Sequence, residues 1–523
     1  MSEPAHRRSL LVGVARDGFI KLAGSICAGV FGFLFVVVIT RRLGPAGTGA
    51  FYEAVALYLI ASSLAKLGAD AGSARMISRY RALGRPLDLR RTVRIALVPV
   101  LVLGGALGAA LFVLAPRIAD LVADGRHAEA IVPYIRVLSP FVSVTAASAV
   151  VLAATRGFQT MIPLVVINNI GRPIARPLLA LAAIAAGLGG VAIALAYATP
   201  VAVGFLAGLA WLLRLLGRAE RRATDEEARP VPTRTLASEF WRFAAPRAFA
   251  AVFSTTVTWL DTLLLGALRS TADAGIYNGA TRYVKLGSFA ITVVYLVISP
   301  RISALLAKND SEGAASIYRT STGWLMLASW PIYLTLAVFA PVLLRVFGGE
   351  FVAGQTALTI LALAMLVSMA AGPAATILLM AGHSMVNTAN TVVALLLNVG
   401  LNLVLIPRYG LTGAAISWAV SIVVNNVAAV AELWLLQRLS PLGPGIWIAG
   451  VASAACFGAL GLGTRLAFGT APVGFLAFGA IATGTYLAVL WRNRDALELS
   501  VLRDALRSSG RGDNGGRRRS ADR

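Results

Sequence analysis

The chain has 523 residues, of which 58% are hydrophobic and only 14% charged, and its mean hydropathy is +0.76. A soluble protein of this length needs a larger polar surface, so this composition excludes a single soluble core. The formal net charge of +23 would suggest nucleic-acid binding in a soluble chain. Here the arginines gather between apolar runs, which is typical of cytoplasmic loops of membrane proteins, and we expect no nucleic-acid partner.

Apolar runs long enough to cross a hydrocarbon core of about 30 Å recur along the whole chain. They predict an all-α polytopic membrane protein, embedded in a lipid bilayer, with about fourteen transmembrane helices. The runs lie at residues 18–40, 49–70, 92–115, 131–155, 161–186, 191–216, 243–266, 276–298, 321–343, 355–380, 385–406, 411–436, 446–467 and 472–491.

Charge predicts the orientation of these helices. The N-terminal segment, the stretch "RMISRYRALGRPLDLRRTVR", the longest connection and the C-terminal tail are strongly basic. The alternate connections, such as "LRSTADAG" and "FGGEFVAG", are shorter and poorer in arginine. Because Lys and Arg accumulate on the cytoplasmic side and an even helix count returns the chain to its starting side, we expect both termini to be cytoplasmic.

An internal repeat with an offset of 226 residues relates the two halves of the chain. Six helices separate the copies, so both copies have the same orientation, and parallel repeats of this kind carry a binding site between them near the middle of the bilayer. The offset aligns the following pairs: Gly49 with Gly275, Phe51 with Tyr277, Arg75 with Arg301, Arg16 with Arg242, and Lys21 with Arg247.

The repeat predicts two parallel six-helix lobes followed by two C-terminal helices. The polar, Pro-containing connection between the lobes reads as a cytoplasmic linker, and the polar C-terminus reads as a largely disordered cytoplasmic tail. The expected bounds are 1–216 for the N-lobe, 217–242 for the linker, 243–437 for the C-lobe, 446–491 for the last two helices and 492–523 for the tail.

Three stretches carry a resemblance to a known superfamily. They are "RRLGPAGTGAFY" with "KLGADAGSARMISRY" (41–52 and 66–80), "ADAGIYNGATRY" (272–283) and "LLLNVGLNLVLIPRYGLTGAAISWAVS" (395–421). The chain resembles the multidrug/oligosaccharidyl-lipid/polysaccharide (MOP) flippase superfamily and, within it, the bacterial polysaccharide (O-antigen type) flippases. The motifs consist mostly of Gly, Pro and Leu, so they do not specify the glycan.

The resemblance implies a location and a cargo. A protein of this family would lie in the bacterial cytoplasmic membrane and move an undecaprenyl-diphosphate-linked oligosaccharide from the inner to the outer leaflet by alternating access. Its partners would be the polyprenyl-diphosphate-linked glycan and the glycan polymerase and glycosyltransferases of the same pathway. The last two helices would form a groove for the lipid tail, as in the related murein-precursor flippases.

Two basic residues lie inside the apolar run 276–298. Measured from Ile276, Arg282 is about 9 Å and Lys285 about 13 Å deep, and both share one helix face. A charge at mid-bilayer costs about 2.5–3.5 kcal/mol, so such residues usually face a cavity or a partner. The repeat places Ala56 and Leu59 at the equivalent positions. We interpret Arg282 and Lys285 as binding the diphosphate, with snorkelling to the headgroups as the alternative.

Four further residues complete the expected pathway. Lys21 and Arg247, at equivalent inner ends of two helices, would form the cytoplasmic entrance for the headgroup, or would serve as ordinary positive-inside anchors. Asp261 would pair with Arg282 or take part in ion coupling. Glu53, near the outer end of its helix, is a coupling or ion-pair candidate or an interfacial carboxylate.

Two pairs of arginines are secondary candidates. Arg172 and Arg176 share one helix face near mid-depth, in the Pro-containing stretch "NNIGRPIARPLL". They would bind cargo or satisfy carbonyl groups that the prolines leave without a donor. Arg41 and Arg42, at the outer end of the first helix, would form an exit site for phosphate or reach toward the headgroups.

The sequence predicts a transporter rather than an enzyme. It contains no "GK" pair and therefore no nucleotide-binding P-loop, and its two cysteines, Cys27 and Cys456, have no metal-ligand spacing. We expect no catalytic residues, no cofactor and no metal. Transport would be driven by an ion gradient, the membrane potential or consumption of the cargo.

Three alternatives remain open at this stage. A lipid II (murein precursor) flippase would share the fold and the diphosphate chemistry. A MATE-like multidrug/cation antiporter would need carboxylates in its cavity, where Lys and Arg outnumber Asp and Glu here. A membrane glycan polymerase or ligase would need a long extracytoplasmic loop with catalytic residues, whereas the predicted outer loops are short.

Overall fold

The computed structural model describes residues 3–123, 128–221, 231–287, 302–308, 310–469 and 471–497. These residues form helices joined by turns, and they fall into two compact units. We call Phe19–Asn278 the N-terminal unit, and Gly279–Arg523 with Met1–Gly18 the C-terminal unit. Parts of the predicted linker, of the run 276–298 and of the tail lie outside the described residues, as does Arg301.

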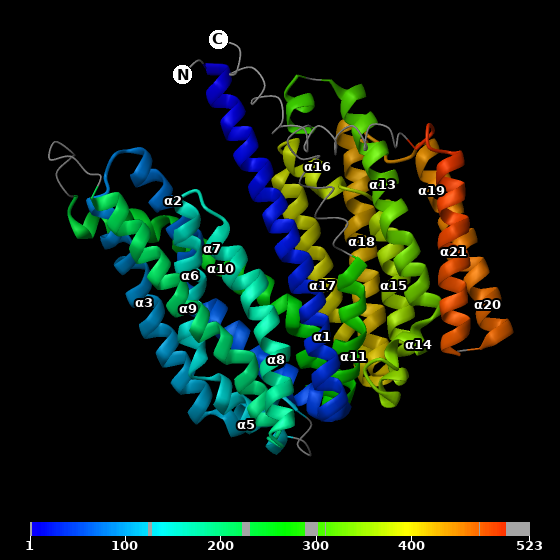
Figure 1. Cartoon of the computed structure of the whole chain (residues 1–523), viewed down its shortest axis with the longest axis horizontal. Coiled ribbons are helices and arrows are strands. Elements are labelled where there is room, and N and C mark those ends of the chain that lie inside the picture. Colours follow the sequence, from blue (N-terminus) through cyan, green and yellow to red (C-terminus); the bar gives the residue numbers. More distant parts are fainter. Residues whose placement is uncertain are drawn as a thin grey trace, which may run out of the picture. The chain divides into compact units, whose positions relative to one another are not determined.

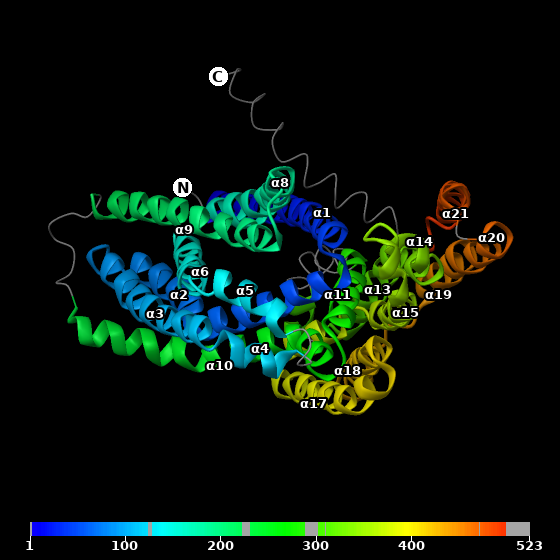
Figure 2. The ribbon, with the colours of Figure 1, turned by 90° about the horizontal axis from the view of Figure 1, so that it is seen from below.

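The N-terminal unit is a helical bundle in which α6 contacts α2, α3 and α9, and α8 packs against α9 (Figure 1). Figure 2 shows the same helices from below. The elements are α1 (Glu3–Lys66), α2 (Ala69–Ala82), α3 (Leu87–Val113), α4 (Ala115–Val122), α5 (Ala128–Leu138), α6 (Phe141–Gly157), α7 (Ile162–Leu164), the π-helix η1 (Val165–Gly171), α8 (Arg172–Ala185), α9 (Gly190–Glu220) and α10 (Thr233–Leu268).

The C-terminal unit pairs α17 with α18 and packs α15 against both α13 and α18. The aromatic residues Phe339, Phe457, Phe478 and Tyr486 form part of its core. The elements are α11 (Thr271–Gly287), which begins in the N-terminal unit, then α13 (Ser311–Val338), α14 (Ala340–Leu344), η2 (Gly349–Gly354), α15 (Gln355–Ala370), α16 (Ala374–Met380), α17 (Ser384–Tyr409), α18 (Leu411–Gln437), α19 (Pro444–Ser453), the π-helix η3 (Ala454–Ala459), α20 (Leu460–Phe468) and α21 (Pro472–Arg492).

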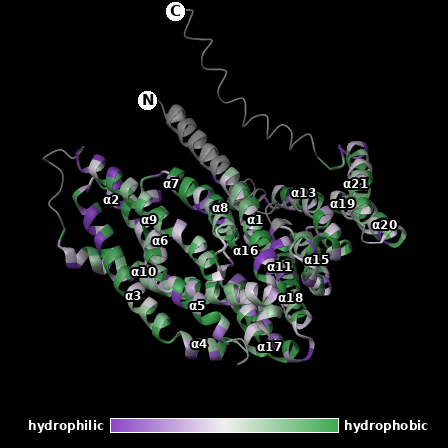
Figure 3. Ribbon diagram, turned by 60° about the horizontal axis from the view of Figure 1, so that its bottom comes forward, coloured by the Kyte–Doolittle hydropathy of each residue, from purple (hydrophilic) through white to green (hydrophobic). Residues whose placement is uncertain are grey.

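The helices have the length and the surface of membrane spans. Nine helical stretches of the described chain are long and apolar enough to cross a bilayer, or ten if the bent pair α5 and α6 counts as one span. Large apolar side chains face outward, with Phe249 82% and Leu466 80% exposed. Figure 3 shows hydrophobic residues along the lengths of α3, α10 and α20. The chain is therefore a multi-pass, all-helical membrane protein.

The number of fourteen helices stays a prediction, because several of the expected apolar runs do not form separate helices in the described residues. The runs 18–40 and 49–70 are joined in α1 across a kink at Gly44, where φ is 66° and ψ is −175°. The run 161–186 is divided by η1, and the run 276–298 is described only as far as Gly287. The lobe boundaries also stay a prediction.

The two copies of the repeat meet at their aligned glycines. A Cβ atom on Gly49 would lie 1.6 Å from the Thr271 carbonyl oxygen, and one on Gly275 would lie 2.1 Å from the Pro45 carbonyl oxygen. Pro45 and Thr271 are themselves separated by the repeat offset. Reciprocal contact, in which each segment presents the same position to the other, is what a two-fold relation produces. The offset read from the sequence therefore relates two segments that touch.

Candidate functional site

The end of α11 carries Arg282 and Lys285 one helical turn apart. Three residues at a spacing of four, Gly279, Tyr283 and Gly287, pack one side of this helix against the C-terminal unit. The Tyr283 hydroxyl donates to a backbone carbonyl oxygen of α14 at 2.6 Å. A Cβ on Gly279 would lie 3.2 Å from an aromatic ring carbon of η2, and one on Gly287 would lie 2.4 Å from a ring carbon of α13.

This packing decides where the two basic side chains lie on the helix. At about 100° per residue, Lys285 lies opposite the packed face of Gly279, Tyr283 and Gly287, and Arg282 lies beside that face. Arg282 is half-buried and Lys285 is exposed. Both cations therefore lie off the face of α11 that carries the contacts of Gly279, Tyr283 and Gly287.

At the predicted inner end of the N-terminal unit, two guanidinium groups lie over one aromatic ring. The Cζ atoms of Arg75 in α2 and Arg247 in α10 are 4.1 Å and 4.0 Å from the centroid of the Phe243 ring. Both arginines are exposed. The chain at the start of α2 can come close to α10 there because Gly68 has no side chain. A Cβ on Gly68 would lie only 2.2 Å from the Ala244 carbonyl oxygen. The Phe243 ring thus brings two exposed guanidinium groups together, and such a pair suits a multivalent anion.

Lys21 lies in α1 and is exposed. The carbonyl oxygen of Lys21 accepts a hydrogen bond from the Ser25 hydroxyl at 2.8 Å, so the helical turn that carries it is regular. Its role at an inner entrance stays a prediction.

The two carboxylates predicted for coupling are both buried in the N-terminal unit. Glu53 is fully buried, and a Cβ on Gly266 would lie 2.4 Å from its Oε1, so the glycine leaves room for the carboxylate. Asp261, in α10, accepts a hydrogen bond from the Tyr277 hydroxyl at 3.0 Å. The place of Glu53 relative to the bilayer and the pairing of Asp261 with Arg282 stay predictions.

Arg172 and Arg176 lie at the start of α8, directly after the π-helix η1. The Nη1 of Arg172 donates to the Asn168 side-chain oxygen at 2.9 Å, and its Nη2 donates to the Ser148 hydroxyl. The Nε of Arg176 donates to the Tyr197 carbonyl oxygen at 3.1 Å, and its guanidinium lies 3.7 Å from the centroid of that ring. The α8 arginines are thus held by neutral groups.

Arg41 and Arg42 lie in α1 just before the kink at Gly44, and both side chains are exposed. This position fits either reading of the pair, as a phosphate exit site or as headgroup contacts.

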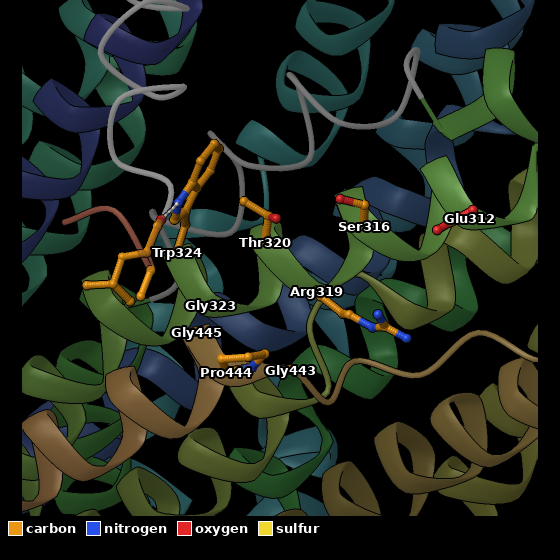
Figure 4. A pocket seen from close by; sticks show the side chains of 11 residues that line it. Glu312, Ser316, Arg319, Thr320, Gly323, Trp324, Gly443, Pro444 and Gly445 are labelled. Atoms are coloured by element: carbon orange, nitrogen blue, oxygen red, sulfur yellow. Dashed lines mark hydrogen bonds between the residues drawn. The ribbon is translucent and has the colours of Figure 1, made fainter. Parts of the chain in front are cut away.

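A pocket of about 340 Å³ lies in the C-terminal unit between α13, the Gly443–Gly445 segment and the residues that follow α21 (Figure 4). The Trp324 indole nitrogen donates to the Leu497 carbonyl oxygen at 3.0 Å and closes one side. The polar lining comes from α13 and consists of Glu312, Ser316, Arg319 and Thr320. This lining has one charge of each sign and includes none of the residues singled out in the sequence.

Sequence reasoning missed Arg75 and Phe243 as part of the basic inner end. The repeat aligned Arg75 with Arg301, which was the available signal, but the shared ring depends on a contact between helices far apart in the chain. In the described parts of the chain, no group of three or more His, Cys, Asp and Glu side chains could hold a metal ion.

Comparison with known proteins identifies the family of the chain. Residues 14–306, more than half of the chain, match the family described as "Polysaccharide biosynthesis protein". The chain belongs to the polysaccharide biosynthesis protein family. A curated relative is the probable low-salt glycan biosynthesis flippase Agl15 of Haloferax volcanii, which is 25% identical over 228 residues. That alignment covers 43% of this chain and 46% of the relative, so the chain spans about half the length of the curated relative it matches.

Solved structures show that this member of the polysaccharide biosynthesis protein family has the MOP superfamily fold. The lipid II flippase MurJ in an inward closed conformation superposes with a TM-score of 0.70 at 12% identity, covering 90% of this chain and 98% of that chain. An inward-facing multidrug resistance MATE family transporter superposes with a TM-score of 0.59 at 16% identity, covering 84% and 98%. At these identities the likeness concerns the fold alone.

Proposed function

We propose that this protein is a flippase that moves an undecaprenyl-diphosphate-linked oligosaccharide from the inner to the outer leaflet of the bacterial cytoplasmic membrane. Family membership, the flippase named among its relatives and the MOP fold support this function. The observation that carries it is the pair Arg282 and Lys285, two cations one helical turn apart on α11 that lie off its packed face. Guanidinium and ammonium groups both bind phosphate oxygens.

In this proposal the chain's own residues act in sequence. Arg75, Arg247 and Lys21 collect the diphosphate at the cytoplasmic side, and Arg282 with Lys285 holds it near mid-depth. The sugars occupy the space between two six-helix lobes while the polyprenyl tail stays in lipid. The two lobes alternate access. Both termini are cytoplasmic, and no bond of the cargo is broken.

The antiporter alternative is favoured by one observation, the two buried carboxylates. A MATE-like exchanger would use Glu53 and Asp261 to bind a cation. If Asp261→Asn abolishes extrusion of a cationic dye by expressing cells and leaves glycan export unchanged, the antiporter reading replaces the flippase. We expect no dye extrusion by the unmodified protein.

Deleting the gene tests the proposal directly. The expected result is loss of a surface glycan together with accumulation of a polyprenyl-diphosphate-linked oligosaccharide, detected by mass spectrometry of the lipid extract. Accumulation of lipid II instead would assign the protein to murein-precursor transport. A deletion strain with normal surface glycan and no accumulated lipid-linked intermediate would rule out both flippase readings.

The inner arginines give a separate prediction. Arg247→Ala should lower glycan export about tenfold, since a hydrogen bond to a charged group contributes about 1.5–3 kcal/mol. Arg75→Ala should act in the same direction, and the double variant should export less than either. Arg234→Ala, an exposed arginine at the start of the same helix α10, is the matched control. Export by Arg247→Ala equal to that by the control would remove the inner arginines from the pathway.

A further inference from the structure

The pocket of about 340 Å³ in the C-terminal unit takes no part in the proposed route. It lies where three helix ends meet: the start of α13, the start of α19 and the residues that follow α21. The charge pattern of the sequence predicts all three ends to be on the cytoplasmic side. On that topology the pocket opens at the inner surface of the membrane, where the headgroups of the inner leaflet lie.

The wall that α13 contributes changes in character along the helix axis. In order from the start of α13, its side chains are Glu312, Ser316, Arg319, Thr320 and Trp324 (Figure 4). At 1.5 Å per residue the first and the last are about 18 Å apart along the axis. The predicted membrane run begins at residue 321, so the charged groups lie toward water and the indole lies at the edge of the apolar run. Tryptophan is enriched at such membrane–water interfaces.

The two charges of the pocket are not used by the protein that surrounds them. Within the described residues, the side chains of Glu312 and Arg319 form no hydrogen bond and no ion pair. Glu312 is not needed as a cap, because the Asp310 carboxylate accepts a hydrogen bond from the Gly313 amide at 2.9 Å and so caps α13. Both charges are therefore available to a ligand in the pocket.

The pocket wall holds the Arg319 stem in place. A Cβ on Gly443 would lie 3.3 Å from the Arg319 Cδ, so the stem lies directly against the segment before α19. Side chains on a helix lean toward its N-terminus, and in Figure 4 the guanidinium extends toward the end of α13 that carries Glu312. On the opposite side, the Trp324 indole is fixed by its hydrogen bond to the Leu497 carbonyl oxygen.

The order of these groups matches one class of lipid headgroup. In a phosphoethanolamine headgroup the phosphate is next to the glycerol and the acyl chains, and the ammonium group lies further out. Arg319, nearer the apolar run, suits the phosphate. Glu312, about 10 Å further along the axis toward water, suits the ammonium group, which has three N–H donors. A diphosphate or an anionic headgroup has no cation to place at Glu312.

We propose that this pocket binds the headgroup of an inner-leaflet phospholipid of the phosphatidylethanolamine class. Arg319 binds its phosphate, Glu312 accepts from its ammonium group, and Trp324 lies beside its glycerol region. The ligand is a lipid of the bilayer itself, so the inference does not depend on the identity of the cargo. A lipid bound there bridges α13 and the ends of α19 and α21, and the stability of the protein then depends on the lipid composition of the membrane.

The purified full-length protein in detergent micelles tests the site without transport. The probe is dioleoyl phosphatidylethanolamine, compared with the phosphatidylcholine and the phosphatidylglycerol that have the same acyl chains, each at the same mole fraction. The readout is the thermal unfolding midpoint. We expect phosphatidylethanolamine to raise it by about 1–3 °C more than either of the other lipids. Phosphatidylcholine has both charges, but its ammonium group has no N–H to donate.

Variants of the pocket locate the effect. Glu312→Gln and Arg319→Gln should each abolish the preference for phosphatidylethanolamine, and Arg408→Gln, an exposed arginine of α17 outside the pocket, should retain it. Native mass spectrometry of the same samples gives a second readout, in which either pocket variant should retain fewer phosphatidylethanolamine molecules than the control. Because both charged side chains are exposed, we expect these variants to fold.

Several results would overturn the inference. Equal midpoints in the three lipids, or an unchanged preference in both pocket variants, would remove the lipid site. A larger rise with phosphatidylglycerol would assign the pocket to an anionic headgroup and contradict the role of Glu312. A rise with farnesyl diphosphate that exceeds the rise with phosphatidylethanolamine would assign the pocket to the cargo. The first two results would leave the flippase function standing, because the pocket is separate from the proposed route.

Discussion

Replacing either Arg282 or Lys285 with alanine should lower glycan export about tenfold or more while the protein stays at its normal level in the membrane. Each cation contributes about 1.5–3 kcal/mol to holding a charged ligand, so a single removal costs about tenfold or more. The double variant should be inactive. Both side chains lie off the face of α11 that carries the contacts of Gly279, Tyr283 and Gly287, so their removal should leave the contacts of that face in place.

Two further variants sharpen this experiment. Arg282→Lys keeps the charge and should retain part of the export, because an ammonium binds phosphate as a point charge without the paired geometry of a guanidinium. Arg408→Ala removes an exposed arginine of α17 and should export normally. Export is measured as surface glycan per amount of membrane protein. Normal export by the double Arg282→Ala, Lys285→Ala variant would show that α11 does not hold the headgroup.

Introducing valine at Gly49 or at Gly275 should remove most of the folded protein. At each position even a Cβ would overlap a backbone carbonyl oxygen of the opposite segment, at 1.6 Å and 2.1 Å. Backbone cannot move aside as a flexible side chain can, and overpacking costs about 1–3 kcal/mol even where the surroundings adjust. We expect both variants to show similar losses, because the two contacts are equivalent under the repeat.

The control for the glycine variants is Gly32→Val in α1, where a Cβ meets nothing within 4 Å. Membrane abundance and the thermal midpoint of the purified protein are the readouts. If Gly49→Val and Gly275→Val accumulate and unfold as Gly32→Val does, the two segments do not pack in the way described. If only one of them is affected, the contact is not reciprocal.

The sequence predicted the membrane-spanning elements because length and apolarity are strongly constrained in a bilayer. The run 191–216 lies within α9, and the run 243–266 lies within α10. Both helices extend further at the predicted inner end, to Glu220 and from Thr233, since the residues there include Arg, Ala and Glu, which favour helix. The repeat offset aligned Gly49 with Gly275, and the structure brings these two positions into contact.

Other features of the site could not be predicted because they depend on contacts between distant helices. Arg75 and Arg247 share one ring only because Gly68 lets α2 approach α10. The irregular turn η1 precedes Arg172 although its residues, "VVINNIG", have no pattern that separates a π-helix from an ordinary one. The burial of the Arg172 Nε depends on Gly204, which lies one helix further along the chain.

The central claim is that fixed cations of this chain carry a lipid diphosphate across the bilayer, and a reconstituted system tests it most directly. The lipid-linked glycan that accumulates in the deletion strain is incorporated into both leaflets of vesicles with the purified protein. A membrane-impermeant hydrolase added outside then reports how much glycan becomes accessible. We predict that the unmodified protein exposes nearly all of the glycan, whereas the double Arg282→Ala, Lys285→Ala variant exposes only the outer-leaflet fraction. Equal exposure by both proteins would contradict the account.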